Sequence, residues 1–261
     1  MNAQSASSLV LTALSGIPVV QPGDDLTKLT ITGLSDSGIA LSHGDVLVFA
    51  QKIVSKAEDR FVNLDKVTPS SKAKKLADET GKDARLVEVI LQESVRVVRT
   101  RENLIIVEHR LGFVCANAGV DHSNVASPSG QPGEWVLLLP ENPDESAQRL
   151  WKEIQDSTGA NIGVLIIDSH GRAWRLGTVG VAIGIAGFPA LLDMRGKPDL
   201  YGDTLMVTQV GLADEVAAGA SALMGQADEG RPIVHVCGLP YELREGNLRE
   251  LIRPKDEDLF R

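Results

Sequence analysis

Cysteine is scarce in this sequence, with Cys115 and Cys237 the two present in 261 residues. Because the two are isolated and lack CxxC spacing, we predict neither a disulfide framework nor a cysteine-based zinc site. The small secreted domains that depend on several disulfides are excluded on the same ground. A reduced protein of the cytoplasm fits this cysteine usage best, since thiols stay reduced there.

Long apolar runs are also missing. Runs such as Val164–Ile167 are far shorter than the about 20 apolar residues that a membrane-spanning helix needs. The N-terminal segment MNAQSASSLVLTAL lacks the basic start and the long apolar centre of a secretory signal. The sequence therefore predicts no membrane association.

An excess of positive charge is absent as well. The formal net charge of -9 and the pI of about 5.1 argue against general binding of nucleic acid. An acidic protein can still hold a local basic pocket for an anionic small molecule. The placement of individual charges must therefore decide which ligand the chain binds.

The common nucleotide and metal motifs are absent too. The segment TGKDAR has no glycine at the position that a P-loop requires, and the central glycines do not form GxGxxG. None of the five histidines belongs to an HExxH motif. Any nucleotide site in this chain must therefore be unconventional.

Helical and strand patterns are mixed along the chain without the regular alternation of a doubly wound sheet. We predict an α+β fold of mixed or antiparallel sheets with packed helices, in one domain over residues 1–261, with two subdomains as the alternative. Residues 127–134 read as a surface loop. Strands are predicted at 10–14, 46–50, 95–100, 103–109, 135–139, 164–167 and 232–237. Helices are predicted before Gly81, around 86–91, from 143 to Gly159 and at 212–224.

The segment Asn161–Gly187 joins an apolar run to charged residues and glycines. The run Val164–Ile167 is typical of a strand buried on both faces, and it stops at Asp168. We predict that the strand ends there and that residues 169–171 form a turn. An acid at a strand end can face a ligand, so Asp168 is a candidate catalytic residue.

Fixed positive charge and small residues follow Asp168. Arg172 and Arg175 are further candidate catalytic residues, because guanidinium groups recognise phosphate well. With Asp168 they indicate a phosphate-bearing ligand with a metal. The pattern equally admits an acid that only caps a turn and glycines that only permit close packing. The glycines concerned allow close backbone approach: Gly177, Gly180, Gly184 and Gly187.

A second acid, Asp121, follows another strand and precedes the amide of Asn124. If Asp121 and Asp168 meet, their oxygens are suited to one divalent cation, whereas a single aspartate would not suffice. Lys56, at the polar end of the strand at 46–50, is a candidate anion contact or a solvated lysine. For His122 and His170 the alternatives are a place near the ligand and a solvated loop, and the solvated loop is the favoured expectation for both.

Seven segments in order, GIPVV, QKIVSKAE, NAGVDHSN, IIDSHGR, GTVGVAIGIAG, DLYG and LMGQADEG, resemble the coenzyme F420-0:γ-glutamyl ligase family over nearly the whole chain. The resemblance implies a GTP-dependent ligase that joins the α-amino group of L-glutamate to a carboxylate of coenzyme F420-0 and then adds further γ-linked glutamate. An acyl phosphate is the expected intermediate, with GDP and phosphate as products. The family also implies a homodimer with an α+β fold and no P-loop.

The resemblance also implies roles for individual residues. Asp121 and Asp168 match the ligands of one divalent cation, Mg²⁺ or Mn²⁺, and Ser169 and Gln226 match those of a second. A monovalent cation such as K⁺ is an additional candidate. The matches to GTP contacts are Ile17, Pro18, Val19, Val20, Gln51, Lys56, Asn124, Met224, Gly225, Gln226, Ala227, Asp228, Glu229, Gly230 and Arg231.

The chain departs from the family pattern at four positions. Ser169 stands where threonine is common, Gln226 where a carboxylate occurs, and Leu176 and Asp203 where relatives carry basic residues. The lost positive charges affect substrate orientation and glutamate-chain length more than the reaction. We expect no nitroreductase-like domain after Arg261. Two alternatives stay open, namely a non-catalytic nucleotide-binding protein of this fold and a ligase for another carboxylate and amino acid.

Overall fold

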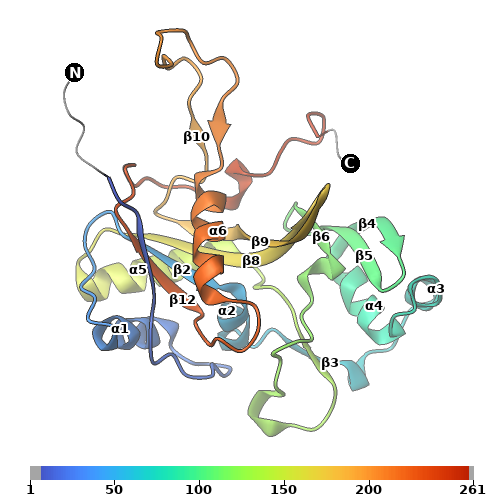
Figure 1. Ribbon diagram of the computed structural model, residues 1–261. Coiled ribbons are helices and arrows are strands. Elements are labelled where there is room, and N and C mark those ends of the chain that lie inside the picture. Colours follow the sequence, from blue (N-terminus) through green and yellow to red (C-terminus); the bar gives the residue numbers. More distant parts are fainter. Residues whose placement is uncertain (1–6, 259–261) are drawn as a thin grey trace.

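The computed structural model describes residues 7–258, so residues 1–6 and 259–261 of the predicted domain lie outside the described part. Its central element is a five-stranded mixed sheet (Figure 1). Neighbouring strands are antiparallel except for the parallel pair β2 and β8. In spatial order the strands are β1 (Val10–Ala13), β12 (Ile233–Cys237), β2 (Val46–Ala50), β8 (Gly163–Arg172) and β9 (Arg175–Ala186).

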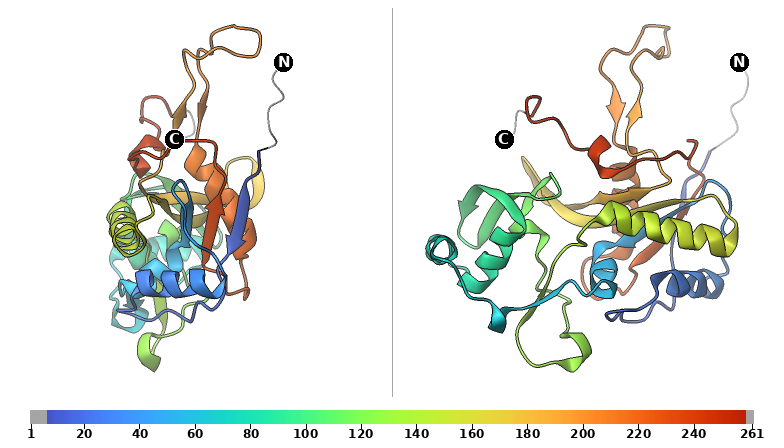
Figure 2. Two further views of the ribbon diagram at one scale, coloured as in Figure 1. Left: turned by 90° about the vertical axis from the view of Figure 1, so that its left-hand side faces the viewer. Right: turned by 180° about the vertical axis from the view of Figure 1, so that it is seen from behind.

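Helices cover both faces of this sheet, which explains why its central strands are apolar without alternation. On β2, Leu47 and Phe49 belong to one hydrophobic core, whereas Val46 and Val48 belong to the core on the other face. The face with Leu47 and Phe49 carries α1 (Leu26–Asp36), α2 (Gln51–Ala57) and α5 (Pro143–Thr158), and the other face carries α6 (Leu212–Met224) (Figure 2).

In the described part of the chain, none of the helices has the length and apolar character needed to span a membrane.

Two glycines of β9 let these helices lie close to the sheet. A Cβ atom at Gly184 would lie 2.4 Å from the carbonyl oxygen of Pro143, at the start of α5. A Cβ atom at Gly180 would lie 2.6 Å from the carbonyl oxygen of Ala217 in α6. No side chain fits at such distances, so Gly180 and Gly184 serve helix packing.

A second layer of structure is inserted between β2 and β8 in the sequence. It consists of two helices packed on a three-stranded antiparallel sheet with its own hydrophobic cluster. The helices are α3 (Ser71–Thr80) and α4 (Ala84–Gln92), and the strands are β4 (Ser94–Arg101), β5 (Leu104–His109) and β6 (Val114–Ala116). A short two-stranded ladder, β3 (Phe61–Asn63) with β7 (Trp135–Leu137), joins it to the rest.

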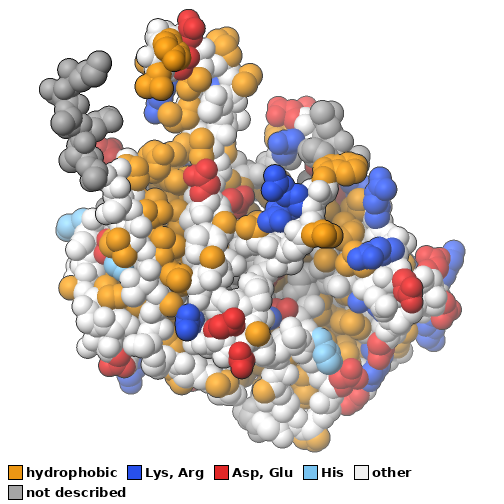
Figure 3. Space-filling model, viewed as in Figure 1, with side chains coloured by type: hydrophobic (Ala, Val, Ile, Leu, Met, Phe, Trp, Pro, Cys, Tyr) orange, Lys and Arg blue, Asp and Glu red, His pale blue; other side chains and the backbone are white. Residues whose placement is uncertain are grey.

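A long arm projects from the molecule between β9 and α6. Its base is the pair β10 (Leu192–Asp193) and β11 (Gln209–Val210), and its tip stands at the top of Figure 1. Hydrophobic side chains gather over the arm in Figure 3. Those with large exposed fractions are Leu200 (98%), Tyr201 (92%), Met206 (75%) and Val207 (84%).

The α+β fold is confirmed, but two local predictions are wrong. β8 does not end at Ile167; it continues to Arg172 and pairs with β9 through Asp168 and Val181. The predicted turn at 169–171 is therefore strand, because β9 supplies a long antiparallel partner and the chain reverses only at residues 173–174. The polar segment after Ala50 is the helix α2 rather than a strand end.

Candidate active site

A cleft of about 900 Å³ lies beside the C-terminal end of β2 and the middle of β8. Its walls come from parts of the chain that are far apart in sequence, among them α2, the middle of β8 and the C-terminal end of α6. The loops around residues 17–20, 117–126 and 225–232 complete it. This volume is large enough for a nucleotide or a comparable ligand.

Gln51 and Asp121 form one side of the cleft. Gln51 is buried, and its side-chain oxygen accepts a hydrogen bond of 2.9 Å from the hydroxyl of Ser55, one helical turn later in α2. The amide nitrogen of Gln51 thereby faces Asp121 and donates to its Oδ2 at 2.6 Å. Backbone hydrogen bonds between Asp121 and Leu137 fix this carboxylate in place.

Lys52 brings a positive charge to the same carboxylate. Its Nζ lies 2.9 Å from Asp121 Oδ2, and both side chains are about a quarter exposed, at 29% and 24%. Burial raises the pKa of Asp121, and the charge of Asp168 adds to this effect, while Lys52 opposes it. The two aspartates therefore lie on one cleft and interact, which sequence spacing alone does not show.

Asp168 lies within β8, and His170 follows on the same face of the strand. His170 Nε2 is 3.1 Å from Asp168 Oδ2, with 12% of the histidine side chain exposed. Burial by itself raises the pKa of Asp168, but the contacts with His170, the backbone of Ser169 and the charge of Lys52 together lower it below its usual value. The prediction that His170 is a solvated loop residue is wrong, because β8 continues past it. His122 is exposed, as predicted.

Behind His170 lies a second histidine. His109 stacks on Phe113 at a ring-centroid distance of 5.1 Å, and Phe113 contacts His170 at 5.1 Å. The ring of His109 is fully buried, and its Nδ1 accepts a hydrogen bond from the backbone of Leu111. Burial, with the nearby charge of Arg110 second, lowers the pKa of His109 from 6.5 to about 3.

This buried histidine predicts a loss of stability in acid. Between pH 6.5 and about 3 the unfolded chain binds a proton at His109 that the folded chain does not, so the free energy of unfolding falls as the pH falls through this range. The contribution is up to about 1.4 kcal/mol per pH unit. His109→Asn keeps an acceptor for Leu111 but cannot titrate. The free energy of unfolding of this variant, measured by urea denaturation from pH 7 to 4, should depend less steeply on pH than that of wild type. His43→Asn is the control, since the exposed His43 also accepts a backbone hydrogen bond. If the free energy of unfolding changes equally with pH in wild type and in His109→Asn, His109 is not the group responsible.

The opposite wall is built from the loop after α6. Asn124 Nδ2 donates to the carbonyl oxygen of Ala227 at 3.0 Å, and Ser169 Oγ donates to Gln226 Oε1 at 3.0 Å. Gly225 begins this loop with φ +75°, a backbone conformation that residues with a side chain rarely adopt. Only glycine fits that backbone, so the loop takes its shape from Gly225.

Lys56 adds positive charge to the cleft, which Lys52 and Arg231 also line. Its side chain is half-buried near the last turn of α2, and its pKa is lowered by burial first and by the charge of Lys52 second. A partly desolvated ammonium group gains most from an anionic ligand, which restores the favourable interaction that water supplied. Lys52 and Lys56 together form a local basic region inside an acidic protein.

The structure brings nearly every predicted site residue to this cleft, including all those matched to GTP and to metal. The exceptions are Arg172 and Arg175, which lie exposed at the tip of the β8–β9 hairpin, outside the cleft lining. Lys52 and His170 were missed as site residues. The signals for them are weak. Lys52 follows Gln51 in the first turn of α2, a helix that the sequence pattern does not indicate, and His170 lies on the same face of β8 as Asp168.

Comparison with known proteins gives a consistent result. Residues 16–238 match the family model described as F420-0:Gamma-glutamyl ligase. The coenzyme F420:L-glutamate ligase of Methanothermobacter thermautotrophicus is 45% identical over 253 residues, which are 96% of this chain and 98% of the relative. The enzyme of the same name from Methanopyrus kandleri is 48% identical over 246 residues, 93% of each chain. That of Methanocaldococcus jannaschii is 46% identical over 221 residues, 85% of this chain and 86% of the relative.

Proposed function

The chain belongs to the F420-0:γ-glutamyl ligase family, and from this membership we propose that it joins L-glutamate to coenzyme F420-0 in a reaction driven by GTP. The family predicted from the sequence motifs is thus confirmed. The observation that carries the proposal is the single cleft on which Asp121, Asp168 and Lys56 meet, from three distant parts of the chain. Two acids can hold a metal ion and a partly desolvated lysine can neutralise phosphate charge, and both roles suit phosphoryl transfer to a carboxylate.

The residues of the cleft fit a divalent cation. The carboxylates of Asp121 and Asp168 are hard oxygen donors of the kind that Mg²⁺ and Mn²⁺ prefer, and we assign one cation to them. The hydroxyl of Ser169 and the amide oxygen of Gln226 are in contact and are assigned to a second. A monovalent cation such as K⁺ is an additional candidate. A bound cation would neutralise nucleotide phosphate charge during phosphoryl transfer.

The chemistry proceeds in two steps. A carboxylate oxygen of coenzyme F420-0 attacks the γ-phosphorus of GTP, the bond to the β,γ-bridging oxygen breaks, and GDP leaves an acyl phosphate behind. The α-amino group of glutamate then attacks the acyl carbon, phosphate leaves, and the amine loses a proton to solvent. Lys52 and Lys56 stabilise the negative charge of the phosphates, and the loop from Met224 to Arg231 encloses the nucleotide. Repetition on the new γ-carboxylate adds a second glutamate.

An isotope experiment tests this proposal. Coenzyme F420-0 labelled with ¹⁸O in its carboxylate is incubated with the protein, GTP, Mn²⁺ and glutamate, and GDP, phosphate and product are analysed by mass spectrometry. Transfer of one ¹⁸O to phosphate supports the acyl phosphate. GTP binding without GDP release would instead indicate a non-catalytic nucleotide-binding protein. Turnover with another acid or amino acid, but not with this pair, would indicate a different ligase.

We also propose that the protein is a homodimer, and the projecting arm supports this. Leu200 and Val207 are 98% and 84% exposed, and contiguous apolar surface of this kind is rare on monomers. The double variant Leu200→Asp with Val207→Asp should halve the mass measured by light scattering, because two charges would be buried without partners in the interface. Val95→Asp, an exposed apolar position on β4, is the control and should stay dimeric. A wild-type protein that scatters as a monomer would refute the proposal.

A further inference from the structure

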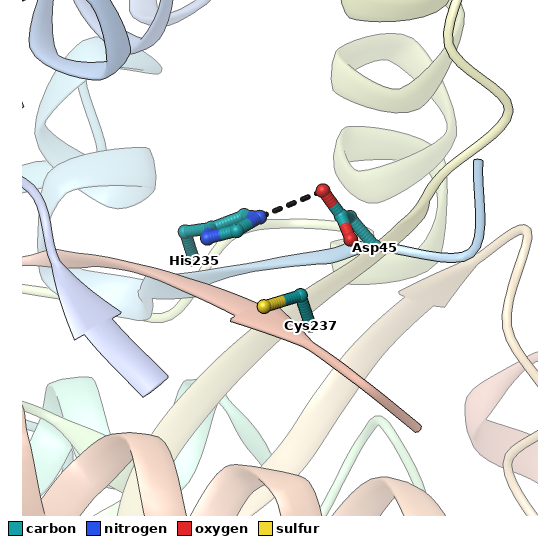
Figure 4. Close-up of side chains that lie close together, drawn as sticks. All are labelled: Asp45, His235 and Cys237. Carbon is teal, nitrogen blue, oxygen red and sulfur yellow. Dashed lines mark hydrogen bonds and ion pairs between the residues drawn. The ribbon is translucent and has the colours of Figure 1, made fainter. Parts of the chain in front are cut away.

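Three potential metal ligands lie together at the end of the central sheet opposite the cleft. Asp45 precedes β2, whose other end leads into Gln51 and the cleft, and His235 and Cys237 belong to β12 (Figure 4). One ligand atom from each residue lies within 4.8 Å of the other two. Asp45 and His235 are buried, with 7% of each side chain exposed, and Cys237 is partly buried. The proposed ligase reaction uses none of them.

The register of the sheet explains this arrangement. β12 and β2 pair antiparallel with Val236 opposite Val46, so one further step places Cys237 opposite Asp45. His235 lies two residues before Cys237 and therefore on the same face of β12. Side chains directly opposite and diagonal to one another on one face are close enough to share a ligand. Figure 4 shows the three side chains on one side of the strands.

From this arrangement we propose that Asp45, His235 and Cys237 bind a thiophilic divalent transition metal of the Zn²⁺ class. Carboxylate oxygen, imidazole nitrogen and thiolate sulfur are the three ligand types that Zn²⁺ takes in proteins, at about 2.0–2.3 Å. A water molecule completes a tetrahedral shell. The hydrogen bond between His235 Nε2 and Asp45 Oδ2, 2.8 Å long, is a contact in which a metal ion can replace the shared proton.

The charges of the three ligands suit a buried cation. A thiolate and a carboxylate together carry two negative charges, so a divalent ion makes the site neutral, and a neutral site is far less costly to bury than an isolated ion. Binding releases the thiol proton of Cys237 to solvent. The bound ion would join β12 to β2 independently of the cleft. Cysteine spacing could not suggest this group, because Asp45 lies 190 residues before His235 in the sequence.

Cobalt spectroscopy tests the site on the full chain. The protein is stripped with a chelator and kept in excess Mg²⁺, so that oxygen-ligand positions of the cleft are filled. Co²⁺ is then titrated while the optical spectrum is recorded. We expect about one Co²⁺ per chain with a thiolate-to-cobalt charge-transfer band and the intense visible bands of tetrahedral cobalt, both lost when Zn²⁺ displaces it. Cobalt held only by oxygen ligands in the cleft cannot give the thiolate band.

Matched variants decide which residues bind the ion. Cys237→Ser should abolish the charge-transfer band and weaken affinity by at least about 100-fold, whereas Cys115→Ser, which changes the other thiol of the chain, should leave the titration unchanged. His235→Ala should also lose the tetrahedral bands. If His235→Ala fails to fold because the buried Asp45 loses its contact with the imidazole, Cys237→Ser still decides. Absence of the band in wild type at millimolar Co²⁺, or the same band in Cys237→Ser, would overturn the proposal.

Discussion

Asp168→Asn is expected to lower GDP release, measured with Mn²⁺, coenzyme F420-0 and glutamate, by about 10²-fold or more. Asparagine keeps the shape of the side chain but removes the negative charge that a divalent cation needs from a hard ligand. The carboxylate lies in the middle of β8 with 16% of its side chain exposed, where few water molecules can take over its role. The thermal midpoint should change little, because asparagine can still accept the local hydrogen bonds.

Asp144→Asn is the matched control for this experiment. Asp144 is also a half-buried acid, at the start of α5, but it accepts hydrogen bonds from the backbone of Ile185 and Leu248, outside the cleft. Its replacement should leave turnover per folded molecule near normal, because these contacts lie outside the cleft. The two variants thus separate a functional acid from a structural one. Near-normal turnover in a folded Asp168→Asn protein would remove Asp168 from the proposed metal site.

Local features of the fold follow directly from the sequence. α1 begins after Asp25, whose side chain accepts a hydrogen bond from the backbone of Lys28, and α3 begins after Ser70 in the same way. Gly81 and Gly159 end their helices in the left-handed conformation. Each of these signals depends on residues a few positions apart, which is why sequence patterns detect them.

Features that depend on distant partners were not predictable in this way. The extent of β8 depends on β9, so the apolar run up to Ile167 marks only its buried half and places Asp168 wrongly at a strand end. The exposure of His170 was mistaken for the same reason. Whether Asp121 and Asp168 meet depends on how the loop that carries Asp121, held by Leu137, lies against β8. The order of motifs in a known family supplied that information, whereas periodicity did not.

We expect the proposed nucleotide site to depend most on Lys56. Chains with a P-loop bind phosphates through backbone amides and one lysine, whereas in the nucleotide site that we propose a half-buried lysine at the end of α2 takes that role. A hydrogen bond to a charged group contributes about 1.5–3 kcal/mol, and each 1.4 kcal/mol corresponds to about tenfold in affinity. Removing Lys56 should therefore weaken GTP binding by roughly 10- to 100-fold.

Isothermal titration of Lys56→Ala with GTP and Mn²⁺ measures this loss directly, and Lys56→Arg should recover part of the affinity because it restores the charge. Lys82→Ala is the control: burial lowers the pKa of Lys82 as it does for Lys56, but Lys82 lies between α3 and α4, away from the cleft. Its affinity for GTP should equal that of wild type. A Lys56→Ala protein that melts normally and binds GTP as tightly as wild type would show that the phosphates lie elsewhere, since a desolvated ammonium group in contact with them cannot be lost without cost.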